Sequence, residues 1–160
     1  MKIRPARSDD LDAIAALLAE NELPTSDATR DLLRDFVVAE DAHGSVVGSV
    51  GLERFGPDAL LRSLAVAGRE RKAGLGSTLL AHAEDMALAT GILELWLLTT
   101  TAAEFFRRAG YALDARPSAP TGIRTSTQFA QLCPSTAVCM RKRLYPPAPG
   151  TPAVDKTAKR

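Results

Sequence analysis

The segment LLRSLAVAGRERKAGLGS, residues 60–77, joins an apolar stretch to a charged loop that carries two glycines. Residues 60–66 are typical of a buried strand, and a helix is predicted to open near Ser77. Glycines let a backbone approach a ligand closely, and the N–H groups at a helix start favour negative charge. Three cations add positive charge at this point: Arg69, Arg71 and Lys72. The segment is therefore predicted to hold a phosphate or a pyrophosphate.

Two other phosphate-binding loops fit this segment poorly. A P-loop needs a lysine directly after its last glycine, but Gly76 is followed by Ser77. A dinucleotide loop needs a third glycine, where this chain has Leu79, and an acidic residue at the end of the next strand. Glu94 has about the right spacing but falls near the start of that strand. Both nucleotide hydrolysis and dinucleotide binding are disfavoured.

The flanking sequence resembles the GNAT superfamily of N-acetyltransferases. The superfamily's acetyl-CoA loop has the pattern [QR]-x-x-G-x-[GA], which Arg71, Gly74 and Gly76 fill, and residues 64–66 and 102–111 match its strand end and later helix. Residues 60–66, 97–102 and 125–134, with Phe105-Phe106, look like the arsenic-resistance N-acetyltransferase (ArsN) group. They are also similar to the acetyltransferase domain of N-acetylglutamate synthases. The resemblance covers roughly residues 1–144.

This resemblance implies an α/β protein with the GNAT fold, in which helices flank a mixed central sheet of about six or seven strands. Residues 36–66 are expected to form an antiparallel meander, and strands 60–66 and 93–98 a parallel pair that splays apart at its ends. The remaining strands are predicted at residues 2–5 and 136–144. Helices are predicted after an N-cap at Ser8 and at residues 27–34, 78–89, 102–109 and 126–132, with a loop at 116–125.

Length and composition predict one domain, residues 1–144, followed by a disordered Pro-rich tail at residues 145–160. The net charge of +1 gives no general attraction to nucleic acid. The chain shows no signal peptide and no run of about 18 apolar residues, so a soluble cytoplasmic protein without a membrane partner is expected. The oligomeric state stays open, with a homodimer as one possible form.

The resemblance implies acetyl-CoA as co-substrate, with no metal. The backbone of Leu64 and Val66 is expected to pair with the pantetheine arm, and the N–H of Ala65 or Val66 is expected to stabilise the carbonyl oxyanion. Phe106 is expected to contact the cofactor. The pyrophosphate loop comprises Arg71, Lys72, Ala73, Gly74, Leu75, Gly76 and Ser77.

Acetyl transfer also needs a neutral amine and release of a thiolate. Glu53 is the first candidate for the base; Asp58, Glu22 and a water relay are alternatives. Many GNAT enzymes place a tyrosine acid in the pattern Asn-x-x-Ala-x-x-x-Tyr, but this chain reads Thr99-x-x-Ala102-x-x-x-Phe106. The usual acid is therefore missing, and Thr99, Thr100 or a water could take its place.

The acceptor is expected to be a small amine. If it carries extra negative charge, as the resemblance implies, an arginine should grip it, and Arg62 and Arg124 are the candidates, with Ser63 and Phe129 nearby. His43 and His82 lack partners that would suggest metal binding. Cys133 and Cys139 are expected to stay thiols.

The sequence thus favours an acetyl-CoA-dependent N-acetyltransferase that acts on a small amino acid or an arsenic-containing amino acid, with a role in arsenic resistance. Three alternatives remain open: a glutamate-type amino-acid N-acetyltransferase, a non-catalytic CoA-binding sensor, and an arsenic binder that uses its thiols.

Overall fold

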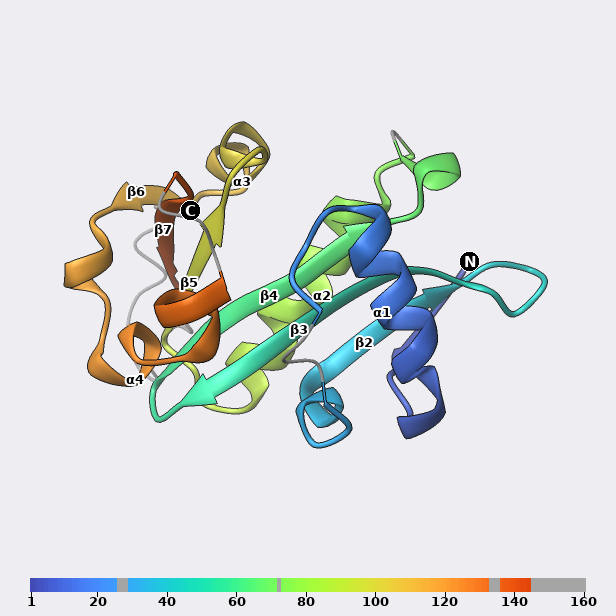
Figure 1. The fold of residues 1–160 in the computed structure, drawn as a ribbon, viewed down its shortest axis with the longest axis horizontal. Helices are drawn as coiled ribbons and strands as arrows, with labels where there is room; N and C mark the ends of the chain where they lie inside the picture. The colour runs from blue at the N-terminus through green and yellow to red at the C-terminus, as the bar shows by residue number, and fades with distance from the viewer. Residues whose placement is uncertain (26–28, 72, 133–135, 145–160) are drawn as a thin grey trace, which may run out of the picture.

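The computed structural model of the protein describes residues 1–25, 29–71, 73–132 and 136–144 (Figure 1). The predicted tail at residues 145–160 lies outside this described part, as do Lys72 of the glycine loop and Cys133. Within the described part, no helix combines the length and the apolar character needed to cross a membrane.

The described residues form a seven-stranded sheet in the order β1-β2-β3-β4-β5-β7-β6. The pair β4–β5 is parallel and every other neighbouring pair is antiparallel. This arrangement confirms the predicted mixed sheet, its antiparallel meander β2-β3-β4 and its parallel pair. The strands are β1 (Lys2–Pro5), β2 (Phe36–Glu40), β3 (Val46–Phe55), β4 (Asp58–Val66), β5 (Glu94–Thr99), β6 (Ala112–Asp114) and β7 (Val138–Arg143).

Two helices cover the two faces of the sheet: α1 (Leu11–Glu20) lies on one face and α2 (Leu75–Ala89) on the other (Figure 1). Each buries one apolar stripe, such as Leu79, Ala83 and Ala87 on α2, which are all fully buried. The α2 helix packs close to β3 because Gly48 has no side chain there; a Cβ at that position would lie 2.7 Å from Leu79.

The connections contain shorter helices. Those are α3 (Ala103–Arg108), α4 (Thr121–Arg124), the π-turn Gln128–Leu132, and the 3₁₀ turns Ser8–Asp10, Leu32–Asp35, Gly68–Glu70 and Arg116–Ser118. Around α4 a second, smaller core forms, separate from the main one. It consists of Leu60, Trp96, Ala119, Ile123, Phe129 and Cys139.

Several predicted bounds need correction. The helix α2 begins at Leu75, not near residue 78, because Gly74 adopts φ +81° and its carbonyl accepts the first helical N–H, from Thr78, at 3.1 Å. Of the helix predicted at residues 27–34, the described part contains a 3₁₀ turn, Leu32–Asp35. The edge strand β6 was not predicted at all. The loop predicted at 116–125 contains α4, and the helix predicted at 126–132 is a single π-turn.

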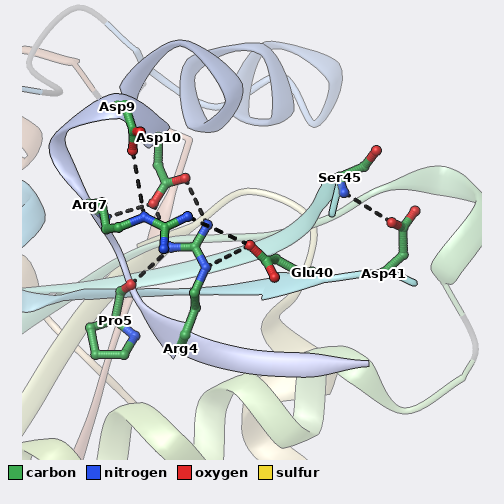
Figure 2. Close-up of polar contacts among 8 residues, drawn as sticks. All are labelled: Arg4, Pro5, Arg7, Asp9, Asp10, Glu40, Asp41 and Ser45. Carbon is green, nitrogen blue, oxygen red and sulfur yellow. Dashed lines mark hydrogen bonds and ion pairs between the residues drawn. The ribbon is translucent and has the colours of Figure 1, made fainter. Parts of the chain in front are cut away.

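The start of α1 is organised by a buried arginine, not by a cap at Ser8 (Figure 2). Arg4, only 9% exposed, donates to both carboxylate oxygens of Asp10 at 2.8 and 2.9 Å and to Glu40 at 2.7 Å. Asp10 also accepts the backbone N–H of Arg7 at 2.6 Å. The Ser8 prediction was therefore wrong: the carboxylate of Asp10 closes this turn and ties β1, β2 and α1 together.

Candidate active site

The parallel strands β4 and β5 separate partway along their length, and Figure 1 shows them diverging. Their pairing covers three residues of β4 and ends at Leu60 opposite Trp96, although both strands continue. A cavity of about 280 Å³ lies at this splayed end. Its lining includes Ser63 and Leu64 of β4, the end of β5, and Phe105 and Phe106 of α3. The predicted splay is confirmed, and it creates an opening at an edge of β4.

A β-bulge shapes β4 beside this cavity. Between Gly51↔Arg62 and Ser49↔Ala65 the register shifts, so β4 holds one residue more than β3. Ser63 lies in the bulge with φ +59°, a conformation that residues other than glycine rarely adopt. No sequence signal marks it, since β4 contains no glycine.

The last residues of β4 alternate between β3 and the opening. The N–H of Ala67 donates to Val47 of β3 at 2.8 Å, so the backbone of the preceding residue, Val66, points the other way. The carbonyl of Val66 accepts from the side chains of Asn21 and Arg71, each at 3.3 Å. Leu64 shares the direction of Val66, whereas Ala65 faces β3. Of the two predicted oxyanion donors, the geometry favours Val66.

The glycine loop leads directly into α2. The first helical hydrogen bond comes from Thr78, so the N–H groups of Leu75, Gly76 and Ser77 precede it, and no described side chain caps them. These donors and the helix dipole favour negative charge at this point, and the anion site at the glycine loop stays a prediction. The side chain of Arg71 binds within the protein: besides its bond to the Val66 carbonyl, it donates to the side-chain oxygen of Asn21 at 2.9 Å. It therefore ties the glycine loop to the end of α1.

The end of β5 and the start of α3 form the opposite wall. The Thr99 hydroxyl accepts the N–H of Ala102 at 3.0 Å, so it stabilises the turn into α3. Thr100 is exposed and also lines the cavity. Phe106 lines it too, 6% exposed, in edge contact with Phe105 and Tyr111. Tyr111 is no substitute acid, because its hydroxyl donates to Glu84 at 2.9 Å and burial raises its pKa.

A second cleft, of about 430 Å³, lies beside the first, between the 3₁₀ turn Leu32–Asp35 and strands β3 and β4. Glu53 and Arg62 line it and form an ion pair at 3.2 Å. The Arg62 side chain is 1% exposed, and its Nε donates to the Ser63 hydroxyl at 3.3 Å. Arg62 lines both cavities. The predicted base, Glu53, and the arginine predicted to bind the acceptor's carboxylate, Arg62, therefore form an ion pair at the boundary of the two cavities.

The structure does not bring every predicted residue to these cavities. Arg124 is exposed and donates to Thr121 at 3.1 Å, Phe129 lies in the smaller core, and neither lines either cavity. Asp58 sits at the paired end of β4, where burial and the neighbouring Glu94 raise its pKa. Glu22 does line the first cavity.

Three polar residues at the first cavity were missed: Asn21, Thr101 and Gln128. Asn21 ends α1 and binds the Val66 carbonyl, and Gln128, 9% exposed, comes from the π-turn. Their position depends on long-range packing, and no local pattern signals it.

Comparison with known proteins agrees with this geometry. Residues 33–113 match the family described as acetyltransferase (GNAT) domain. The structure of N-acetylglutamate synthase from Neisseria gonorrhoeae, complexed with coenzyme A and N-acetyl-glutamate, is 26% identical, with a TM-score of 0.78 over 91% of this chain. The alignment covers 35% of that protein, so the chain spans about a third of its length.

Two further structures share the fold at lower identity. A Mycobacterium tuberculosis protein in complex with CoA is 21% identical, with a TM-score of 0.77, and the match covers 91% of this chain and all of that one. An N-acetyltransferase of Thermoplasma acidophilum in complex with coenzyme A is 17% identical, with a TM-score of 0.64, over 89% of this chain and 98% of that one. Since the matched family spans half of the sequence and the fold agrees with it, the chain belongs to the GNAT acetyltransferase domain family.

Proposed function

We propose that the protein transfers the acetyl group of acetyl-CoA to the amino group of a small amino acid. The observation that carries this proposal is the edge of β4 beyond Leu60, which pairs with no described residue of β5. Leu64 lines the cavity at this edge, and the backbone of Val66 points away from β3. An extended pantetheine arm can add to such an edge as a strand would. The N–H groups at the start of α2 would bind the pyrophosphate.

Acetyl-CoA supplies an activated acyl group, and the protein positions it. In this proposal the N–H of Val66 stabilises the negative charge that develops on the acyl oxygen. Glu53 accepts the proton of the amine directly or through a water, while Arg62 fixes the carboxylate. Thr99, Thr100 or a water donates a proton to the departing thiolate. A thiol whose ordinary pKa is about 8.5 leaves readily, so positioning of the amine matters more than an acid.

The cleft lined by Glu53 and Arg62 is proposed as the acceptor site. It contains charges of both signs, including the pair Arg54–Asp35 at 3.0 Å, which suits a ligand with an ammonium and a carboxylate. Two acceptors have specific support: glutamate, because the Neisseria synthase binds N-acetyl-glutamate, and an arsenic-containing amino acid, from the sequence resemblance to the ArsN group. Either would present an additional anion to Arg62.

The first test is binding of acetyl-CoA, followed by turnover. Acetyl-CoA at about 100 times its Kd should stabilise the fold by roughly 2.7 kcal/mol. For a chain of this size that corresponds to a rise in Tm of roughly 5–11 °C in a thermal denaturation scan. Release of free CoA thiol is then measured with a panel of amines that includes glutamate and arsenic- and phosphorus-containing amino acids. A rise in Tm with no turnover across the panel would support the CoA-binding sensor instead.

The role of Arg62 predicts a preference for acceptors with a free carboxylate. An acceptor whose carboxylate is converted to an amide should have a kcat/KM lower by roughly 10- to 100-fold, since a charge-assisted hydrogen bond contributes about 1.5–3 kcal/mol. Arg62→Lys keeps the positive charge but loses the planar guanidinium, so it should reduce the difference in kcat/KM between the free and the amidated acceptor. Equal kcat/KM values for the free and amidated acceptors would contradict the assignment.

Phe106 stands where many GNAT enzymes have a tyrosine acid. Restoring that phenol with Phe106→Tyr should change kcat less than about tenfold, because protonation of the thiolate contributes little to the rate. The initial rate of CoA release at saturating substrates measures this, with Phe105→Tyr on the same helix as the matched control. A gain larger than tenfold that is confined to Phe106→Tyr would show that the missing phenol limits turnover.

The thiol-based alternative gains no support from Cys139. This thiol is 3% exposed, and burial raises its pKa to about 11, so the thiolate that binds soft metalloids is disfavoured. Cys133 lies outside the described residues.

A further inference from the structure

The bulge in β4 determines which backbone donors point away from β3, toward the free edge of β4. With an unbroken register after Gly51↔Arg62, Val47 would lie opposite Val66. The observed register places Ala67 there instead, with its N–H bonded to Val47. The extra residue thus shifts the alternation by one position, so that the N–H of Val66 points to the opening instead of to β3.

Two buried side chains, Ser49 and Arg62, contact the bulged residue. Ser49 of β3 is fully buried, and its hydroxyl donates to the carbonyl of Ser63 at 2.8 Å. From the other side, Arg62 donates to the hydroxyl of Ser63 at 3.3 Å. The positive φ of Ser63 is unfavourable for a residue with a Cβ, and the bond from Ser49 offsets that cost.

We propose that Ser49 is a positioning residue for acetyl transfer: its bond to the Ser63 carbonyl maintains the bulge and thereby directs the Val66 N–H toward the acyl oxygen. The proposal rests on the proposed function only in the role that it gives to Val66. Ser49 acts through Ser63 and touches neither substrate. Its loss should therefore lower kcat, and the KM for acetyl-CoA should rise as well, because the bulge also sets the direction of the Leu64 and Val66 backbone that is proposed to pair with the pantetheine arm.

The test is a double-mutant cycle of Ser49→Ala and Ser63→Gly. Glycine adopts a positive φ without strain, so a bulge with glycine at position 63 needs no support from Ser49. In the Ser63 background, Ser49→Ala should lower kcat by about tenfold or more. In the Ser63→Gly background the same substitution should lower it less than about threefold. The proposal would be overturned if Ser49→Ala lowered kcat by the same factor with serine and with glycine at position 63. It would also be overturned if Ser49→Ala lowered only the Tm and left kcat unchanged.

Two further arms keep the test decisive. If the single variant Ser49→Ala does not fold, Ser63→Gly is compared with the double variant Ser49→Ala/Ser63→Gly. The kcat values of these two variants must agree within about threefold. Failure of the double variant to fold while Ser63→Gly folds would contradict the proposal. The ¹³Cα and ¹³Cβ shifts of Ser63 follow its φ and ψ and need no acceptor. They should move toward extended values in Ser49→Ala, and unchanged shifts would overturn the proposal even if the acceptor has been misassigned.

Discussion

Replacing Asp10 with alanine should lower the free energy of unfolding by about 3 kcal/mol, which corresponds to a fall in Tm of roughly 6–12 °C. The variant leaves the buried guanidinium of Arg4 without its bidentate partner and the N–H of Arg7 without its acceptor (Figure 2). Breaking one side of a buried ion pair is costly because water does not replace the lost partner, and Glu40, 2.7 Å from Arg4 Nε, compensates the remaining charge only in part. Urea denaturation at pH 7 measures the change.

The same pair makes the effect dependent on pH. Hydrogen bonds from Arg4 lower the pKa of Asp10, so its folded-state pKa lies below its unfolded value of about 3.9. The stabilisation is therefore fully present above pH 4 and is lost as the pH falls through the folded-state pKa. The matched control is Asp9→Ala, whose carboxylate is 81% exposed and lies 3.7 Å from Arg7. Similar losses in the two variants would refute a special role for Asp10.

Val66→Pro should reduce kcat for acetyl transfer by about 10²- to 10³-fold, the usual loss when one oxyanion donor is removed. Proline lacks the N–H that points away from β3 at this position, and its ring occupies the space in front of it. The pairing of β4 with β3 should survive, because the Val66 backbone points away from β3. Single-turnover release of CoA thiol measures the change, with circular dichroism to verify the fold.

Two variants calibrate this result. Val66→Ala shortens the side chain but keeps the N–H, so it should lose much less activity than Val66→Pro. Ala65→Pro removes a donor on the β3 side and should lower Tm more than Val66→Pro does. If Val66→Ala and Val66→Pro lose equal activity, the side chain and not the backbone donor at this position is what matters.

Much of the fold was predictable because its main signals are local. Apolar runs and turn residues defined β1, β2 and β3, and the glycine pair with its flanking charges predicted α2, although its start was placed a few residues too late. The edge strand β6 was missed because it has three residues and exposes Leu113, so it shows no alternating pattern. The start of α1 was assigned to the wrong cap because Asp10 binds Arg4 of a different element.

The site was predicted less completely, for the same physical reason. The sequence indicated Arg62 and Glu53 separately, but their ion pair follows from the register of β3 against β4. No glycine marks the bulge at Ser63 in the sequence, and nothing in the sequence around Ser49 distinguishes it from other serines in strands. Arg124 and Phe129 were predicted near the acceptor because they follow in sequence, yet packing places one in solvent and the other in the smaller core.

Arg62 also bears on how this protein could diversify. Of the described residues that line the two cavities, it is the one that belongs to both. Most of the cleft proposed for the acceptor, including the turn Leu32–Asp35, could therefore change by mutation while the cavity proposed for the donor stays intact. If acidic acceptors bind Arg62 as proposed, a lineage that abandons them would have to replace Arg62, and that step would disturb Ser63 and the first cavity as well. Changes of acceptor preference that retain this arginine should be far more accessible to evolution than changes that remove it.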